Sequence, residues 1–211
     1  MDLNFFGKQG SGKGTQARII AEQFGYKIFE TGQALRDIAK EDSPLGREVN
    51  SIMQAGKLVP IEIVVNVLED FVKKANPEEK IIFDGIPRSL EQKEHFDKIS
   101  EKYNRSVLNI LIDISDQEAL TRLSARKICD SCRKVYGASH KGKYCPQCGQ
   151  ELTQRLDDNP EAIKQRLAIY ASETRPVIQE YESQQNMITI NGENDIEAIT
   201  AAINKEIKNK S

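Results

Sequence analysis

The chain has 211 residues, of which 38% are hydrophobic and 29% charged, and its formal net charge is −2. These values are typical of a globular protein and exclude a disordered chain or one embedded in a membrane. The near balance of charge also excludes a general attraction to nucleic acid or anionic lipid, so any bound anion must be held by a local cluster of basic residues.

The N-terminal segment MDLNFFGKQGSGKG has neither the basic start nor the long apolar stretch of a secretory signal. No segment reaches the roughly 20 apolar residues that cross a bilayer. We therefore expect a cytoplasmic protein, in which thiols stay reduced.

Short apolar runs alternate with helical patterns along most of the chain. The predicted strands are 3–6, 27–29, 81–84, 107–114 and 187–190. The first predicted helices are 13–24, 32–40, 45–55 and 61–74. A further helix is predicted on each side of the fourth strand, and a last one begins at about residue 195 and ends in a frayed, lysine-rich tail. Strands that alternate with helices indicate the α/β class, with a doubly wound parallel sheet of five strands.

Residues 127–158 interrupt this alternation, because they are rich in Cys, Gly, Lys and polar residues and predict neither a helix nor a long strand. We interpret them as an inserted lobe. Its apolar residues are too few to stabilise it alone, so it needs an additional cross-link.

A glycine-rich segment, GKQGSGKGT from Gly7 to Thr15, lies between the first predicted strand and the first predicted helix. Glycines let backbone N–H groups turn inward around a phosphate, and the helix N-terminus adds its positive dipole end. Lys13 can then reach the β- and γ-phosphates of a nucleotide. The general pattern has Ser or Thr directly after the lysine, whereas Gly14 intervenes here. A turn without a ligand is the alternative, but the strand–loop–helix context favours a phosphate-binding loop.

Four cysteines form two C-x-x-C pairs, Cys129/Cys132 and Cys145/Cys148, separated by twelve residues. This is zinc-ribbon spacing, in which each pair occupies a tight turn and four thiolates complete a tetrahedron. Disulfides are the rival interpretation, and a cytosolic location disfavours them. The spacing therefore predicts a closed, structural zinc site. Four thiolates leave no ligand position for His140, and His95 lies in a charged helical run that is typical of a solvated face.

Gly12–Gln16 resembles the phosphate loop of nucleoside monophosphate kinases, and of adenylate kinases in particular. Further segments resemble that family in the same order: ETGQALR (30–36), GKLVP (56–60), DGIPR (84–88) followed by Gln92, RLSAR (122–126) and RLDD (155–158). The resemblance covers about residues 3–195. It implies a P-loop NTPase type of fold and a Mg²⁺-dependent, reversible transfer of the terminal phosphoryl group of ATP to AMP, giving two ADP, by a monomer.

The resemblance also implies roles for individual residues. Those on the ATP side are Gly10, Ser11, Gly12, Lys13, Gly14, Thr15, Arg126, Val135, Tyr136 and Asn194. Those on the AMP side are Thr31, Arg36, Lys57, Leu58, Val59, Gly85, Ile86, Pro87, Arg88, Gln92, Arg155 and Arg166. The catalytic set is Lys13, Arg88, Arg126, Arg155 and Arg166, and Asp84 is implied to hold Mg²⁺ through water. Arginine forks suit phosphate oxygens, and phosphoryl transfer needs alignment and charge neutralisation more than proton chemistry. We expect Asp157 and Asp158 to orient arginines.

Three units follow from the same resemblance: a core of 1–29, 60–126 and 159–211, an AMP-binding lobe of 30–59, and a zinc-binding lid of 127–158. The chain departs from the family at Gln9, Gln33 and Ile61. Gln33 replaces a carboxylate expected near the hydration shell of Mg²⁺, which puts the metal affinity in question.

Three other functions are compatible with parts of the sequence. Within the class, the rival is a kinase of UMP, CMP or GMP, against which Thr31 and Gln92 favour adenine by analogy. A zinc-ribbon module that binds nucleic acid or protein would place the ribbon outside a catalytic framework, whereas these cysteines interrupt a series of phosphate-site motifs. A regulatory GTPase would carry an Asn-Lys-x-Asp motif, which the sequence lacks.

Overall fold

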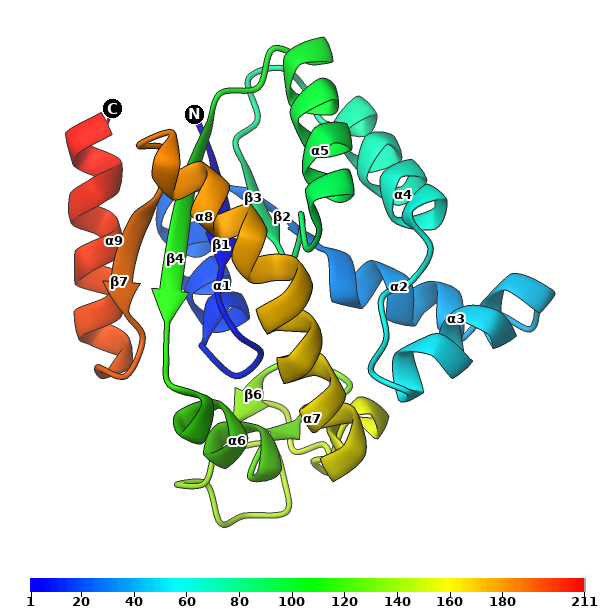
Figure 1. Ribbon diagram of the computed structural model, residues 1–211. Coiled ribbons are helices and arrows are strands. Elements are labelled where there is room, and N and C mark those ends of the chain that lie inside the picture. The colour runs from blue at the N-terminus through cyan, green and yellow to red at the C-terminus, as the bar shows by residue number, and fades with distance from the viewer. Residues whose placement is uncertain (211) are drawn as a thin grey trace.

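The computed structural model describes residues 1–210, apart from the side chain of Leu156. Ser211, which the expected core unit includes, lies outside the described residues. At its centre is the expected five-stranded parallel sheet, with the strand order β2-β3-β1-β4-β7 (Figure 1). The strands are β1 (Asp2–Phe6), β2 (Lys27–Glu30), β3 (Ile81–Asp84), β4 (Val107–Asp113) and β7 (Ile188–Asn191). Every residue of β1 is buried, as expected for a central strand covered on both faces.

Helices cover both faces of this sheet. On one face, α1 (Lys13–Phe24) and α9 (Ile196–Lys210) pack against strand residues such as Leu3, Phe5 and Ile110. On the other face, α4 (Ile61–Lys74) and α5 (Leu90–Lys102) cover Ile81 and Phe83, while α8 (Arg175–Ser183) covers Phe6 and Leu111. Alternate residues of each strand face opposite layers, which confirms the doubly wound arrangement. The last helix runs to Lys210, so it includes the lysine-rich tail.

Two helices, α2 (Thr31–Ala39) and α3 (Pro44–Gln54), extend away from the sheet as a small helical lobe (Figure 1). The start of α3 is fixed by the sequence: Ser43 caps it by accepting a 2.9 Å hydrogen bond from the N–H of Gly46, and Pro44 occupies its first turn. The lobe ends at Gly56, which has a φ of +70°. A β-carbon there would lie 2.7 Å from the carbonyl oxygen of Ala162. Only glycine therefore allows the lobe to approach the helix that contains Ala162 so closely.

After α6 (Asp116–Ser124), the inserted segment forms a second lobe, below the sheet in Figure 1. It holds a small antiparallel pair, β5 (Lys127–Ile128) and β6 (Val135–Tyr136), and a 3₁₀ turn, η1 (Leu156–Asp158). The chain then returns through α7 (Pro160–Ile169) and a π-helical segment, η2 (Tyr170–Thr174), into α8. Among the described residues, no helix combines the length and apolar character needed to cross a membrane.

Candidate active site

A cavity of about 420 Å³ opens beside the carboxyl ends of β2 and β3, between the phosphate loop, the α2–α3 lobe and the inserted lobe. Its size is typical of a small-molecule site. Three of its lining residues are acidic, Glu30, Asp84 and Asp157, and nine are basic: Lys13, Arg18, Arg36, Lys57, Arg88, Arg122, Arg126, Arg155 and Arg166. The chain as a whole is slightly acidic, so this local excess of positive charge marks the cavity as a site for a polyanion.

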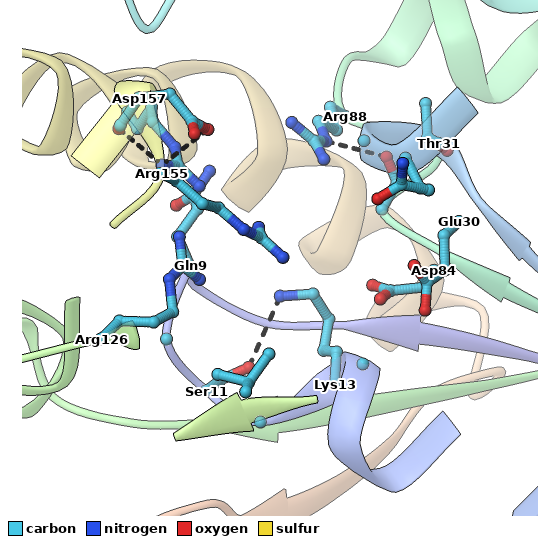
Figure 2. Close-up of a pocket in the computed structure, with 18 of the residues that line it drawn as sticks. Gln9, Ser11, Lys13, Glu30, Thr31, Asp84, Arg88, Arg126, Arg155 and Asp157 are labelled. Atoms are coloured by element: carbon cyan, nitrogen blue, oxygen red, sulfur yellow. Dashed lines mark hydrogen bonds and ion pairs between the residues drawn. The ribbon is translucent and has the colours of Figure 1, made fainter. Parts of the chain in front are cut away.

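The glycine-rich segment forms a loop around Lys13, at the start of α1. Gly12 caps the helix with a φ of +95°, a conformation that an L side chain rarely adopts, and lets the loop turn into the helix. The Lys13 ammonium donates hydrogen bonds to the carbonyl oxygens of Gly7 (2.6 Å) and Lys8 (2.9 Å) and lies 3.5 Å from Ser11 Oγ. The loop therefore holds this cation inside the cavity (Figure 2).

The electrostatic surroundings make the Lys13 cation unfavourable as the site stands. Burial lowers the pKa of Lys13 to about 8; Asp84 opposes this shift, whereas Arg88, Arg166 and Arg126 add to it. A group of positive charges that destabilise one another is arranged to receive negative charge, because an anion would relieve the desolvation and the repulsion together.

Arg126 and Arg166 are held by the carboxylates of η1. Asp158, whose side chain is fully buried, accepts from Arg126 Nε at 2.7 Å and from Arg166 Nη1 at 3.1 Å. Asp157 lies 3.2 Å from the same Arg166 atom. Burial raises the pKa of Asp157, but Arg166, Arg155, Arg36 and Arg126 together bring it below its usual range. The acidic pair thus orients arginines, as expected.

Arg88 and Arg155 also point into the centre of the cavity (Figure 2). Arg88 is anchored by a 2.8 Å hydrogen bond from its Nε to the carbonyl oxygen of Gly85, and burial beside Arg166 lowers its pKa to about 10. Arg155 Nε is buried without a hydrogen-bond partner among the described residues. Burial and the neighbouring Arg126 and Arg36 lower the pKa of Arg155 to about 9. Both guanidinium groups remain charged at neutral pH.

The α2 side of the cavity offers groups suited to a second ligand. The side chain of Thr31 is buried, and its hydroxyl has no hydrogen-bond partner among the described residues. Gln92 is also buried, and its Oε1 accepts from the backbone N–H of Arg88 at 2.8 Å. Gln33 Oε1 lies 3.2 Å from Arg36 Nη2, and its amide donates to Asp37. The departure at Gln33 therefore has a structural use, because this side chain orients Arg36.

One pair in this region was not anticipated from the sequence. Arg18, on α1, forms a 2.8 Å ion pair with Glu30, the residue just before Thr31, and both line the cavity. In the parallel register, Glu30 stands beside Asp84. An arginine in the middle of a helix is usually read as solvated, so only the fold reveals this pairing.

Most of the residues expected to contact nucleotide or Mg²⁺ line the cavity, but three do not. Those that do are Gly10, Ser11, Gly12, Lys13, Gly14, Thr15, Thr31, Arg36, Lys57, Leu58, Val59, Asp84, Gly85, Arg88, Gln92, Arg126, Val135, Tyr136, Arg155 and Arg166. Ile86 and Pro87 line a separate cavity of about 30 Å³ behind the loop. Asn194 is exposed between β7 and α9. Other lining residues that sequence reasoning missed include Gln16, Met53, Ile196 and Ile199.

The four cysteines converge in the inserted lobe. Their sulfur atoms all lie within 4.8 Å of one another, with Cys129 and Cys148 at 3.4 Å and Cys132 and Cys145 at 3.5 Å. A disulfide would need about 2.05 Å, and all four thiols are free. Zinc bonds of about 2.3 Å would set tetrahedral sulfurs about 3.8 Å apart, so the cluster fits this metal.

The Cys145 sulfur has an additional donor in its surroundings. The hydroxyl of Tyr136 lies 3.0 Å from Cys145 Sγ. Burial raises the pKa of Cys145, but the Tyr136 hydroxyl and the backbone N–H groups of Cys148 and Gln147 lower it to about 6. At Cys132, by contrast, a backbone N–H group lowers the pKa, but burial and the neighbouring thiols raise it to about 12. The surroundings thus favour the thiolate form, which binds metal, at Cys145 and not at Cys132.

Comparison with known proteins gives consistent matches. The adenylate kinase family model matches residues 5–186. A protein named adenylate kinase from Alkaliphilus oremlandii is 38% identical over 208 residues, which cover 96% of each chain. Another of that name, from Kosmotoga olearia, is 36% identical over 99% of this chain and 100% of its own. A third, from Chlamydia muridarum, is 35% identical over 97% of this chain and 85% of its own. The similarity therefore extends over nearly the whole chain.

Proposed function

Because the chain belongs to the adenylate kinase family, we propose that its cavity binds ATP and AMP together and moves the terminal phosphoryl group from one to the other, giving two ADP. The observation that carries this proposal is the convergence of six long cations on one cavity from the phosphate loop, both lobes and the core: Lys13, Arg36, Arg88, Arg126, Arg155 and Arg166. Transfer between two phosphates demands such neutralisation and alignment.

The cavity residues divide into two sides. The loop from Gly10 to Thr15, with Arg126 and the lobe residues Val135 and Tyr136, would hold the donor. Thr31, Arg36, Lys57 and Gln92 would hold the acceptor. Arg88, Arg155 and Arg166 lie where the two phosphate chains would meet, and would stabilise the charge that shifts during transfer. The buried, unpartnered Thr31 hydroxyl supports a base contact on the acceptor side.

The residues present fit the metals that this chemistry implies. Asp84 ends β3 inside the cavity, and its Oδ2 lies 3.3 Å from where a β-carbon on Gly14 would stand, so the loop glycine leaves space beside this carboxylate. Asp84 would hold Mg²⁺ through water, and the ion would neutralise charge on the ATP phosphates. Cys129, Cys132, Cys145 and Cys148 would hold a structural zinc.

Three units serve this reaction in the proposal. Residues 1–29, 60–126 and 159–211 form the core, residues 30–59 an acceptor lobe, and residues 127–158 a zinc-bound lid over the donor. The helical lobe and the inserted lobe both project from the sheet, on either side of the cavity, which supports this division. We further propose a monomeric, cytoplasmic enzyme.

The decisive experiment is a coupled assay of ADP formation from ATP with AMP, CMP, UMP or GMP as the acceptor. We expect AMP to exceed the other acceptors by at least about 100-fold in kcat/KM, because a site built around base-edge hydrogen bonds rejects bases that leave those groups unpaired. A better rate with CMP, UMP or GMP would instead identify the corresponding monophosphate kinase.

The assay needs a control for contaminating kinase from the expression host. The variant Lys13→Ala, purified in the same way, supplies it. Loss of this cation should lower kcat by at least about 100-fold while circular dichroism shows an intact fold. Activity in the variant above about a tenth of that of the unaltered chain would contradict the role of Lys13.

A further inference from the structure

One side chain is shared by the cysteine cluster and the nucleotide cavity. Tyr136 lines the cavity between Val135 and Gly137. Its hydroxyl lies 3.0 Å from the sulfur of Cys145. A phenol O–H can donate to a thiolate, so a single rigid ring connects the wall of the cavity to a metal ligand.

The fold determines which cysteine this hydroxyl reaches. Cys129 and Cys132 lie in the turn between β5 and β6, and Tyr136 is the last residue of β6. Cys145 belongs to the other C-x-x-C pair, so the hydrogen bond crosses from one cysteine turn to the other. Backbone N–H groups also approach the ligand sulfurs, but they do not extend into the cavity.

The ring also packs against a second ring. The imidazole of His140 lies against it, with the ring centroids 4.8 Å apart and the planes inclined at 40°. His140 Nε2 is in turn 3.3 Å from the carbonyl oxygen of Tyr144, the residue before Cys145. Movement of the Tyr136 ring would therefore disturb both its bond to Cys145 and the chain that leads into Cys145.

We propose that Tyr136 is a positioning residue that couples retention of the metal to occupancy of the donor side of the cavity. The proposal rests on the proposed function in one respect, that the ligand is ATP. A donor to a metal-bound thiolate fixes the orientation of that ligand and spreads its charge. A nucleotide packed against the ring restricts its motion and so preserves the hydrogen bond. By linkage, the metal must favour nucleotide binding by the same factor.

The first test measures the release of zinc from the folded holoprotein to the chromogenic chelator 4-(2-pyridylazo)resorcinol, without nucleotide. Tyr136→Phe keeps the ring and removes the hydroxyl, so we expect release about tenfold faster than from the unaltered chain. Tyr144→Phe is the matched control, because this tyrosine also adjoins Cys145 but its side chain is 62% exposed. It should release zinc at the unaltered rate.

The second test adds a non-hydrolysable ATP analogue with Mg²⁺ and no AMP. The analogue should slow zinc release from the unaltered chain and from Tyr144→Phe, and should lose most of this effect in Tyr136→Phe. The zinc affinity of the unaltered chain, measured by chelator competition with and without the analogue, and its analogue affinity, measured with and without zinc, should change by the same factor. This comparison tests the coupling without any variant.

Equal release rates for Tyr136→Phe and the unaltered chain would overturn the proposal, as would equal protection by the analogue in both. These readouts do not depend on turnover. A chain that formed no ADP but released zinc faster as Tyr136→Phe would therefore refute the proposed reaction and leave the role of the hydrogen bond intact.

Discussion

At the scale of single residues, burial and mutual repulsion disfavour the positive charges in the cavity, and a bound anion would reduce both effects. Lys13 is the clearest case, since its ammonium hydrogen-bonds to carbonyl oxygens of its own loop and has three arginines among its electrostatic neighbours. With a pKa of about 8, Lys13 is largely neutral at pH 9 in the folded protein, whereas an unfolded lysine is charged.

This difference predicts proton uptake on binding. At pH 9, phosphates beside Lys13 should raise its pKa again, so the binding of an ATP analogue should take up a sizeable fraction of one proton. Calorimetric titrations in buffers of different ionisation enthalpy measure this number directly. The uptake should fall towards zero at pH 6.5, where Lys13 is already charged, and should be absent in Lys13→Met. Uptake that persists in Lys13→Met would assign the proton to another group.

Arg88 and Gln92 should differ in their kinetic effects. Arg88→Ala should lower kcat by at least about 100-fold, because a cation at the reacting phosphates acts mainly in the transition state. Gln92→Glu keeps the oxygen that accepts from the Arg88 backbone and removes the amide donor, so it should chiefly raise the KM for AMP. Steady-state kinetics check both variants. The reverse pattern would mean that these two residues have been assigned to the wrong steps.

At the scale of elements, the ion pair of Arg18 and Glu30 ties α1, which begins with Lys13, to the last residue of β2, which is also the N-cap of α2. The pair is partly buried, at 31% and 19% side-chain exposure, so it is less screened than a surface pair. Its position just before Thr31 makes it a brace between the donor loop and the acceptor lobe.

Breaking this brace should weaken acceptor binding. We expect Glu30→Gln to raise the KM for AMP by about five-fold, equivalent to about 1 kcal/mol, with the KM for ATP nearly unchanged. The charge swap Arg18→Glu/Glu30→Arg should recover part of the loss. If a double-mutant cycle gave no coupling energy between the two positions, the ion pair would make no contribution to acceptor binding.

Many of the helices and strands could be predicted from the sequence, and those features that could not be predicted have physical causes. The helical pattern of 61–74 predicted both ends of α4 correctly, and the apolar run of 81–83 followed by Asp84 predicted β3. The π segment η2 was missed, because one inserted residue barely changes a helical pattern in sequence. The pairings of Arg18 with Glu30 and of Tyr136 with Cys145 were also missed, since each joins elements that only the tertiary fold brings together.

At the scale of the whole molecule, the inserted lobe depends on a different source of stability from the sheet. The sheet is enclosed by apolar layers, whereas the lobe has short strands, few buried apolar side chains and the cysteine cluster. Metal binding and folding of this lobe should therefore be linked, while the core folds without the metal.

Removal of zinc, or the variant Cys145→Ala, should loosen residues 127–158 and leave the core folded. Hydrogen exchange followed by mass spectrometry should show faster exchange in the lobe and unchanged protection in β1, β3 and β4. Affinity for ATP should fall, because Arg126 directly precedes the lobe and Arg155 lies within it. Tyr144→Phe serves as the matched control. Loss of protection across the sheet would contradict the independence of the two parts.

The strand order has a consequence for synthesis on the ribosome. β1 lies at the centre of the sheet, yet its two neighbours, β3 and β4, begin only at Ile81 and Val107. At about 5–20 residues per second, the interval between β1 and a complete β4 is on the order of 5–20 s. During that time at least one edge of β1, a strand whose residues are all buried in the folded sheet, is unpaired, which is when nascent chains associate wrongly. The emerging chain therefore has most need of a chaperone before residue 113 has left the exit tunnel.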